Sequence, residues 1–189
     1  MNAYSDFVGW KFCNCAVEGW MKMTELFSAE LEREAVGTRS VLERVPEGRY
    51  DWKPHEKSML LGYLATLVAT MPAWIAMTIK NDDWDLKPAG GPRPQPQPRT
   101  RKELLQAFEE SLAAGREALA NTSDEHLMKP WRLLVGGRVV AEQPRHIMLR
   151  DSVFNHLAHH RGQLTVYLRL NEASVPAIYG PSADEGRFE

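Results

Sequence analysis

The stretch that decides the fold is NHLAHHRGQLTVYLRL, residues 155–170, within the last long helical pattern of this 189-residue chain. His156 and His160 are four residues apart, so a helix places them one turn apart on the same side. On a helical wheel both imidazoles fall within the apolar stripe, whereas His159 falls toward the polar flank. We therefore expect His156 and His160 to face the interior and His159 to be more exposed.

Two histidines with this spacing can offer two nitrogens to one metal ion. The alternative is that both imidazoles are satisfied by hydrogen bonds in the core, as single helical histidines usually are. No glutamate stands beside His156, so the His-Glu-x-x-His pattern of metalloproteases is excluded. The spacing alone leaves metal binding and core packing both open.

Three residues after the pair are further site candidates. Arg161 could grip a carboxylate of a substrate with its planar fork, or form a salt bridge to a neighbouring helix. Gln163 borders the histidine face and could orient one imidazole. Tyr167 could supply a hydroxyl to a pocket, although a buried tyrosine at this spacing is more often part of the core.

Composition excludes several classes of protein. The length suits one domain, and a formal net charge of −2 argues against nucleic-acid binding, which needs a basic surface. The longest apolar stretch, residues 59–79, is interrupted by polar residues and Pro72, so no membrane span is expected. No secretory signal is visible. We expect a cytoplasmic protein without nucleic-acid or membrane partners.

Four long helical segments follow from apolar residues repeating at helical spacing. They cover about residues 24–45, 58–75, 100–120 and 145–171. Ser58 is the expected N-cap of the second, and Thr100-Arg101-Lys102-Glu103 is a capping box that opens the third.

Three further features separate or interrupt these helices. Pro72 should kink the second helix, because proline removes a backbone donor and crowds the preceding turn. Residues 88–98 are rich in proline and predict a stiff surface loop. Residues 131–140 predict a small hairpin turning on Gly136 and Gly137.

The two cysteines of the chain are Cys13 and Cys15. Their spacing makes a strained disulfide, and a cytosolic setting would keep them reduced. They are either soft metal ligands or incidental residues of an N-terminal extension, residues 1–23.

The motifs resemble one family. The 155–170 block, followed by VPAIYG at 175–180, closely resembles the DinB-like and YfiT-like metalloenzymes. SMLLGYLA at 58–65, continuing to MPAW at 71–74, looks like the second helix of that family. The likeness covers about residues 24–182, which leaves 183–189 as a C-terminal tail.

The resemblance implies an all-α fold: an up-down-down-up four-helix bundle with a small β-hairpin before the last helix. It also implies a homodimer, and a divalent ion (nickel, zinc or iron) held by one histidine of the second helix and two of the last. His156 and His160 match the latter two. The second-helix histidine falls on Leu67, which is a departure from the family pattern.

Leu67 leaves the expected site with two protein ligands instead of three, so the ion would be weakly bound or absent. Four other places could supply the missing ligand. These are His55, the pair Cys13 and Cys15, His126, and His146.

Two functions follow from the resemblance. The first is a metal-dependent enzyme acting on a thiol or another small molecule, as a transferase, isomerase or hydrolase, with a degenerate metal site. The second is a non-catalytic binding or stress-response scaffold that has lost its metal. Leu67 favours the scaffold, whereas the intact pair of histidines favours the enzyme.

Overall fold

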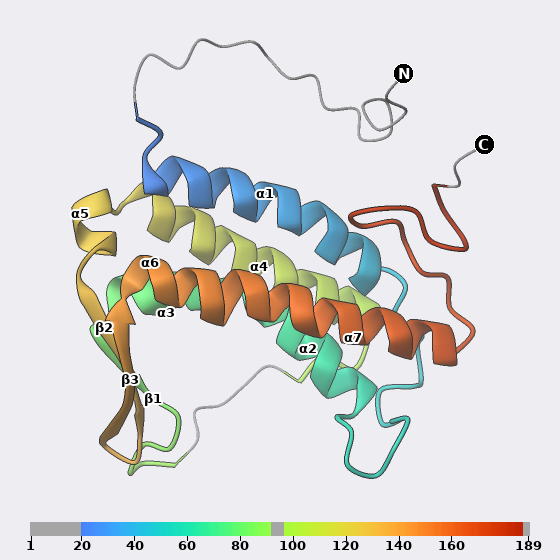
Figure 1. The fold of residues 1–189 in the computed structure, drawn as a ribbon. Coiled ribbons are helices and arrows are strands. Elements are labelled where there is room, and N and C mark those ends of the chain that lie inside the picture. Colours follow the sequence, from blue (N-terminus) through green and yellow to red (C-terminus); the bar gives the residue numbers. More distant parts are fainter. Residues whose placement is uncertain (1–19, 92–96, 187–189) are drawn as a thin grey trace.

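The computed structural model describes residues 20–91 and 97–186, which form a mostly helical fold with a small three-stranded sheet at one end (Figure 1). The α-helices are α1 Met23–Leu42, α2 Leu61–Thr70, α3 Ala73–Lys80, α4 Arg101–Ala120, α5 Asp124–Leu127, α6 Arg145–Met148 and α7 His156–Leu170. A π-helical segment, η1 Leu149–Asn155, lies between α6 and α7. The strands are β1 Asp83–Asp85, β2 Pro130–Val135 and β3 Arg138–Pro144.

The core lies between the long helices and contains the apolar stripes predicted from the sequence. The side chains of Leu31, Leu64, Phe108 and Leu164, from α1, α2, α4 and α7, are each at most 1% exposed. Within the described residues, no single helix is long and apolar enough to cross a membrane, and only the bent pair α2–α3 reaches that length and composition when taken together.

The N-termini of α1 and α4 begin close to the predicted positions. The carboxylate of Asp124, in α5, accepts hydrogen bonds from the Met23 and Thr24 amides at the start of α1. Thr100 caps α4 as predicted, because its hydroxyl accepts from the Glu103 amide at 3.2 Å. The Glu103 carboxylate accepts from the Arg99 amide, one residue before the partner that a capping box would use.

The predicted N-cap of the second helix is wrong. Helix α2 begins at Leu61 with Leu60 as its N-cap, and Ser58 lies outside it. The amides of Leu61 and Gly62 donate to the backbone carbonyls of Trp52 and Tyr50, at 2.8 and 2.9 Å. The preceding loop therefore satisfies the free amides that a side-chain cap would otherwise serve.

Pro72 separates α2 from α3, which are bent by 53° relative to each other. The Ser111 hydroxyl on α4 accepts from the Ala73 amide at 2.8 Å and donates to the Thr70 carbonyl at 2.9 Å. The Thr70 carbonyl and the Ala73 amide are the backbone groups on either side of the break between α2 and α3. Gly115 lies so close that a Cβ there would be 2.9 Å from the Pro72 carbonyl oxygen. The predicted kink is confirmed, and α4 holds it.

The last predicted helix, about residues 145–171, is present as α6, η1 and α7 in direct succession. Its π-helical segment was not predicted, because a wider turn leaves no signature in a pattern of 3.6-residue period. Phe154 of this segment stacks on Phe27 of α1 with ring centroids 5.6 Å apart. The segment ends directly before His156.

The hairpin is confirmed, and a third strand joins it. Gly136 and Gly137 form the turn with φ of 60° and 78°, the left-handed values that a tight hairpin turn requires. Strand β1 pairs in parallel with β2 and was missed, because three residues are too few to show alternation. The Asp85 carboxylate in β1 accepts hydrogen bonds from both glycine amides, at 2.9 and 2.7 Å. Part of the proline-rich stretch, 92–96, lies outside the described residues.

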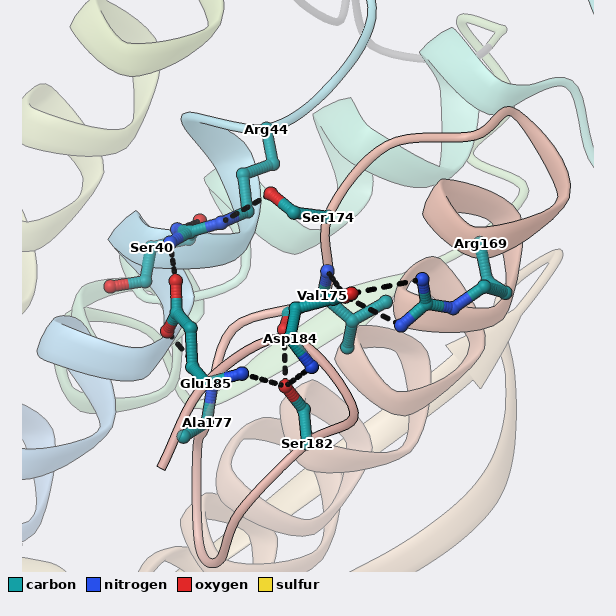
Figure 2. A network of polar contacts seen from close by, with 9 residues as sticks. All are labelled: Ser40, Arg44, Arg169, Ser174, Val175, Ala177, Ser182, Asp184 and Glu185. Carbon is teal, nitrogen blue, oxygen red and sulfur yellow. Dashed lines mark hydrogen bonds and ion pairs between the residues drawn. The ribbon is translucent and has the colours of Figure 1, made fainter. Parts of the chain in front are cut away.

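After α7, residues 171–186 fold back along the end of α1 and are held by polar contacts (Figure 2). Arg44, just after the end of α1, forms an ion pair with Glu185, and Arg169 of α7 contacts Asp184 at 2.5 Å. The Ser182 hydroxyl accepts from the Asp184 and Glu185 amides. Asp184 and Glu185, which were assigned from the sequence to a tail after residue 182, are therefore bonded to the helical body.

Candidate functional site

His156 and His160 face each other on one side of the last helix. Their Nε2 atoms are 2.8 Å apart, and their ring centroids are 4.5 Å apart. His160 is 6% exposed, His156 is half-buried, and His159 is exposed. The predicted order of burial is confirmed.

The outer nitrogens of both rings are already engaged. Gln163 donates from its amide nitrogen to His159 Nε2 at 3.1 Å, so its Oε1 accepts from His160 Nδ1–H at 2.7 Å. The backbone carbonyl of Ser152 accepts a hydrogen bond from His156, whose Nε2 faces the partner ring. The two Nε2 atoms therefore point toward one another and share a hydrogen bond, as inner nitrogens can when each Nδ1 is held by an outer partner.

Burial lowers the pKa of the His156 imidazole below its usual range, and the neighbouring charges of His160 and His159 act in the same direction. The hydrogen bond to Ser152 opposes this shift without cancelling it. His156 is therefore neutral at neutral pH, which is the form that binds a metal ion.

A tryptophan lies against the pair. The Trp74 ring, on α3 just after the kink, is 5.7 Å from the His156 ring at an interplanar angle of 55°. Trp74 is half-buried. This neighbour was not predicted from the sequence, because the contact depends on the angle between α3 and α7.

Within the part of the chain that the structure describes, no third ligand joins the pair. Among residues 20–91 and 97–186, no group of three or more His, Cys, Asp or Glu side chains could hold a metal ion. Leu67 is half-buried and packs against the core. The donor set thus fits a loosely held ion with two protein nitrogens and does not fit a three-ligand centre.

The histidines considered as replacements for the missing ligand have other partners. His55 is exposed and accepts from the Lys57 amide. His126 contacts the Ile79 carbonyl at 2.9 Å, and His146 contacts the Leu127 carbonyl at 3.2 Å. Cys13 and Cys15 lie outside the described residues.

Arg161 is turned away from solvent and is 1% exposed. Its Nη2 is 2.6 Å from the Glu34 carboxylate of α1, and its Nη1 donates to the Thr38 hydroxyl at 2.9 Å. The Tyr179 hydroxyl contacts the same guanidinium and donates to Glu34 at 2.6 Å. These contacts support the salt-bridge interpretation of Arg161, because the guanidinium nitrogens that would bind a substrate carboxylate are already hydrogen-bonded within the protein.

Tyr167 lies in the core. It is 9% exposed, its hydroxyl donates to the Met59 carbonyl at 3.2 Å, and its ring meets Trp52 edge-on at 5.6 Å. The packing interpretation of Tyr167 is the one that these contacts support.

A cavity of about 320 Å³ lies beside the sheet, away from the histidine pair. Its lining consists of Pro130 and five charged residues, which are Asp82, Lys129, Arg132, Glu142 and Arg145. Arg145 is buried there because its guanidinium bonds to surrounding carbonyls. The sequence identified it only as the start of a helix.

Comparison with known proteins gives a consistent result. The model of the DinB family matches residues 21–187. A DinB-like protein from Bacillus cereus ATCC 10987 is 24% identical, with a TM-score of 0.62 over 81% of this chain and 95% of its own. A DinB-like protein from Bacillus subtilis is 19% identical, with a TM-score of 0.59 over 80% and 96%. Both likenesses concern the fold. No curated protein matches the chain significantly.

Proposed function

Because the chain belongs to the DinB family, we propose that it is a metal-dependent member whose metal site is degenerate. His156 and His160 hold a divalent ion (nickel, zinc or iron) weakly, and Leu67 stands where the family pattern has a third histidine. The distance of 2.8 Å between the two Nε2 atoms carries this proposal. The engaged outer nitrogens support it, because they fix both rings with their Nε2 atoms converging, and an ion would take the place of the proton that these atoms share.

The chemistry suited to such a site acts on a thiol or another small molecule, by transfer, isomerisation or hydrolysis. A divalent ion, when bound, supplies Lewis-acid chemistry and lowers the pKa of a coordinated thiol or water. The chain contributes His156 and His160 as nitrogen donors, and Gln163 fixes the His160 ring by accepting its Nδ1 proton. Arg161 contributes stability to the helix rather than a contact to the substrate.

Metal analysis of protein purified without an affinity tag tests this proposal. We expect substoichiometric occupancy that is lost in His160→Ala and retained in the control His55→Ala, whose ring is exposed. Occupancy near one ion per chain would overturn the degenerate site. Binding that survives His160→Ala would show that the ion is held elsewhere.

The alternative is a non-catalytic scaffold that keeps the fold without the chemistry. Leu67 favours it, as does the missing third ligand among the described residues. A protein loaded with nickel, zinc or iron that shows no turnover with a panel of thiols, and a stability unchanged by a chelator, would support the scaffold. Thiol-dependent turnover that disappears in His160→Ala would support the enzyme.

We further propose the up-down-down-up four-helix bundle as the architecture. In this description α1 and α4 are two of the four bundle helices. Helices α2 and α3 are the halves of a third, and the segment from α6 to α7 is the fourth (Figure 1). The support is that α4 packs against α1, α2 and α3, while α7 packs against α1 and α2. The sheet lies at one end of these helices.

We also propose a homodimer formed through α2 and α7. Residues 59–79 contain no charged side chain, yet Tyr63 is 61% exposed, and Val166 on α7 is 57% exposed. The Thr66 and Thr70 hydroxyls donate to carbonyls of their own helix, so neither needs an outside partner. The α2 part of this interface carries no charged side chain, which suits a two-fold axis because no like charges are brought together there.

Sedimentation of the purified chain tests the dimer. We expect Tyr63→Lys to shift the population toward monomer, because it places two ammonium groups near the axis. Val36→Lys on α1 is the control, since Val36 is 69% exposed and lies on another helix. A monomeric parent protein, or equal effects of the two substitutions, would contradict this interface.

A further inference from the structure

The bend between α2 and α3 sets the direction in which Trp74 points. Trp74 is two residues beyond Pro72, and α3 leaves the direction of α2 by 53°. Ser111 bridges the Thr70 carbonyl and the Ala73 amide across the break. The indole therefore projects from a segment whose orientation is fixed by the Ser111 hydroxyl, which bonds to the backbone on both sides of the break.

The Trp74 ring ends a row of four rings. The centroid distances along the row are 5.7 Å from Trp74 to His156, 4.5 Å from His156 to His160 and 5.0 Å from His160 to His159. Gln163 holds the far end of the row through hydrogen bonds to His160 and His159. His160 is buried, whereas His156 is half-buried and packs against Trp74.

The two imidazoles thus differ in what prevents their rotation. The Gln163 amide fixes His160 by a hydrogen bond of 2.7 Å. His156 has the Ser152 carbonyl as its outer partner and His160 Nε2 as its inner one. Each bond holds a single ring atom, so together they leave the ring free to tilt about the line that joins them. The flat indole beside His156 blocks the tilt, because close-packed side chains leave no room for it.

We propose that Trp74 is the positioning residue of His156: it holds the imidazole so that Nε2 points at His160 Nε2. The proposal rests on the proposed metal site for its effect on ion binding, while the ring contact itself exists without an ion. Trp74 acts through His156 and is given no contact with the ion or with a substrate.

Titration with cobalt(II) is the first experiment. We expect Trp74→Ala to bind cobalt about tenfold more weakly than the parent, the loss typical when a group that orients a metal-bound histidine is removed. Trp74→Phe should recover most of the affinity, because a ring still packs on His156. The control Trp52→Ala removes an indole that packs on Tyr167 instead and should leave the affinity unchanged.

Fluorescence gives a readout that a general loss of stability would not produce. Cobalt bound at the pair should quench part of the tryptophan emission of the parent protein, and this quenched part should be absent in Trp74→Phe. Equal cobalt affinity in the parent and in Trp74→Ala would overturn the proposal, as would equal quenching in the parent and in Trp74→Phe.

A second experiment uses ion-free protein, so that failure of the metal site is distinguishable. The indole ring current should displace the proton resonances of the His156 ring, and Trp74→Ala should move them while Trp52→Ala does not. If the parent shows no cobalt binding that depends on His160, the proposed function fails and this measurement decides the positioning role alone. Unmoved His156 resonances in Trp74→Ala would overturn it.

Discussion

At the scale of single residues, the buried ion pair between Glu34 and Arg161 makes a sharp prediction. Replacing Glu34 by Gln leaves the Arg161 guanidinium buried without its counter-charge, which should cost about 3–5 kcal/mol in the free energy of unfolding. Glu32→Gln is the matched control, because Glu32 lies on the same helix and pairs with Arg116 in solvent. Loss of that exposed pair should cost about 0–1 kcal/mol.

Urea unfolding of both variants measures this difference. Similar losses in Glu34→Gln and Glu32→Gln would show that the buried pair contributes no more than an exposed one.

The same carboxylate predicts how stability depends on pH. Burial raises the pKa of Glu34, but hydrogen bonds from Tyr179 and Arg161 outweigh burial and hold the pKa below its usual value of 4.5. The unfolded chain therefore takes up this proton first as the pH falls. Stability from Glu34 should be complete well above pH 4.5 and lost as the pH falls below it.

Unfolding free energies measured between pH 7 and pH 3 test this dependence. The Glu34→Gln variant should show a shallower decline below pH 4.5 than the parent protein. Parallel curves would mean that Glu34 has the same pKa in the folded and unfolded chain.

At the scale of elements, Arg145 joins the end of α3 to the start of β2. Its guanidinium donates to the Thr78 and Asn81 carbonyls, at 3.1 Å each, and to the Pro130 carbonyl at 2.8 Å. Lysine carries its three N–H donors on one nitrogen, so it cannot reach three carbonyls that are served by three separate guanidinium nitrogens. Arg145→Lys should therefore destabilise the protein by about 2–3 kcal/mol, since each buried carbonyl left without a donor costs about 1–3 kcal/mol.

Thermal unfolding of Arg145→Lys checks this, with Arg132→Lys as the control. Arg132 pairs with Asp83, and both side chains are 45% exposed. An Arg145→Lys variant as stable as the control would show that the junction is held by its backbone contacts alone.

The helices were predictable from sequence because their signals are local. The stripe on α4, the Thr100 cap and the Gly136-Gly137 turn each depend on residues a few positions apart. Strand β1 and the start of α2 were not predictable, because both are decided by partners distant along the chain or by loop backbone. The carbonyls of Tyr50 and Trp52, which receive the first amides of α2, carry no side-chain signature.

At the scale of the whole molecule, the candidate site also has a part that local sequence signals predict and a part that only the packing of distant segments decides. The pair His156 and His160 followed from helical spacing, and so did the exposure of His159. The contact with Trp74 depends on the bend at Pro72 and on how α3 approaches the last helix, which a single sequence does not specify. Arg161 could be placed on its helix, but its partner Glu34 comes from 127 positions earlier in the chain.

The last prediction concerns the position on α2 at which the proposed metal site lacks a third ligand. It tests how α2 and α7 meet. Helix α2 packs against α7, and Leu67 on α2 is the position that we propose to correspond to the second-helix histidine. Leu67→His should bring a third imidazole toward the pair and raise divalent-ion affinity by well over about tenfold, since three protein ligands complete the usual open site. Isothermal titration with zinc measures the change. Leu67→Asn is the control, because it introduces a polar side chain without an imidazole and should leave the zinc affinity near that of the parent. Equal affinity in the parent and in Leu67→His would show that this position of α2 does not face the histidine pair.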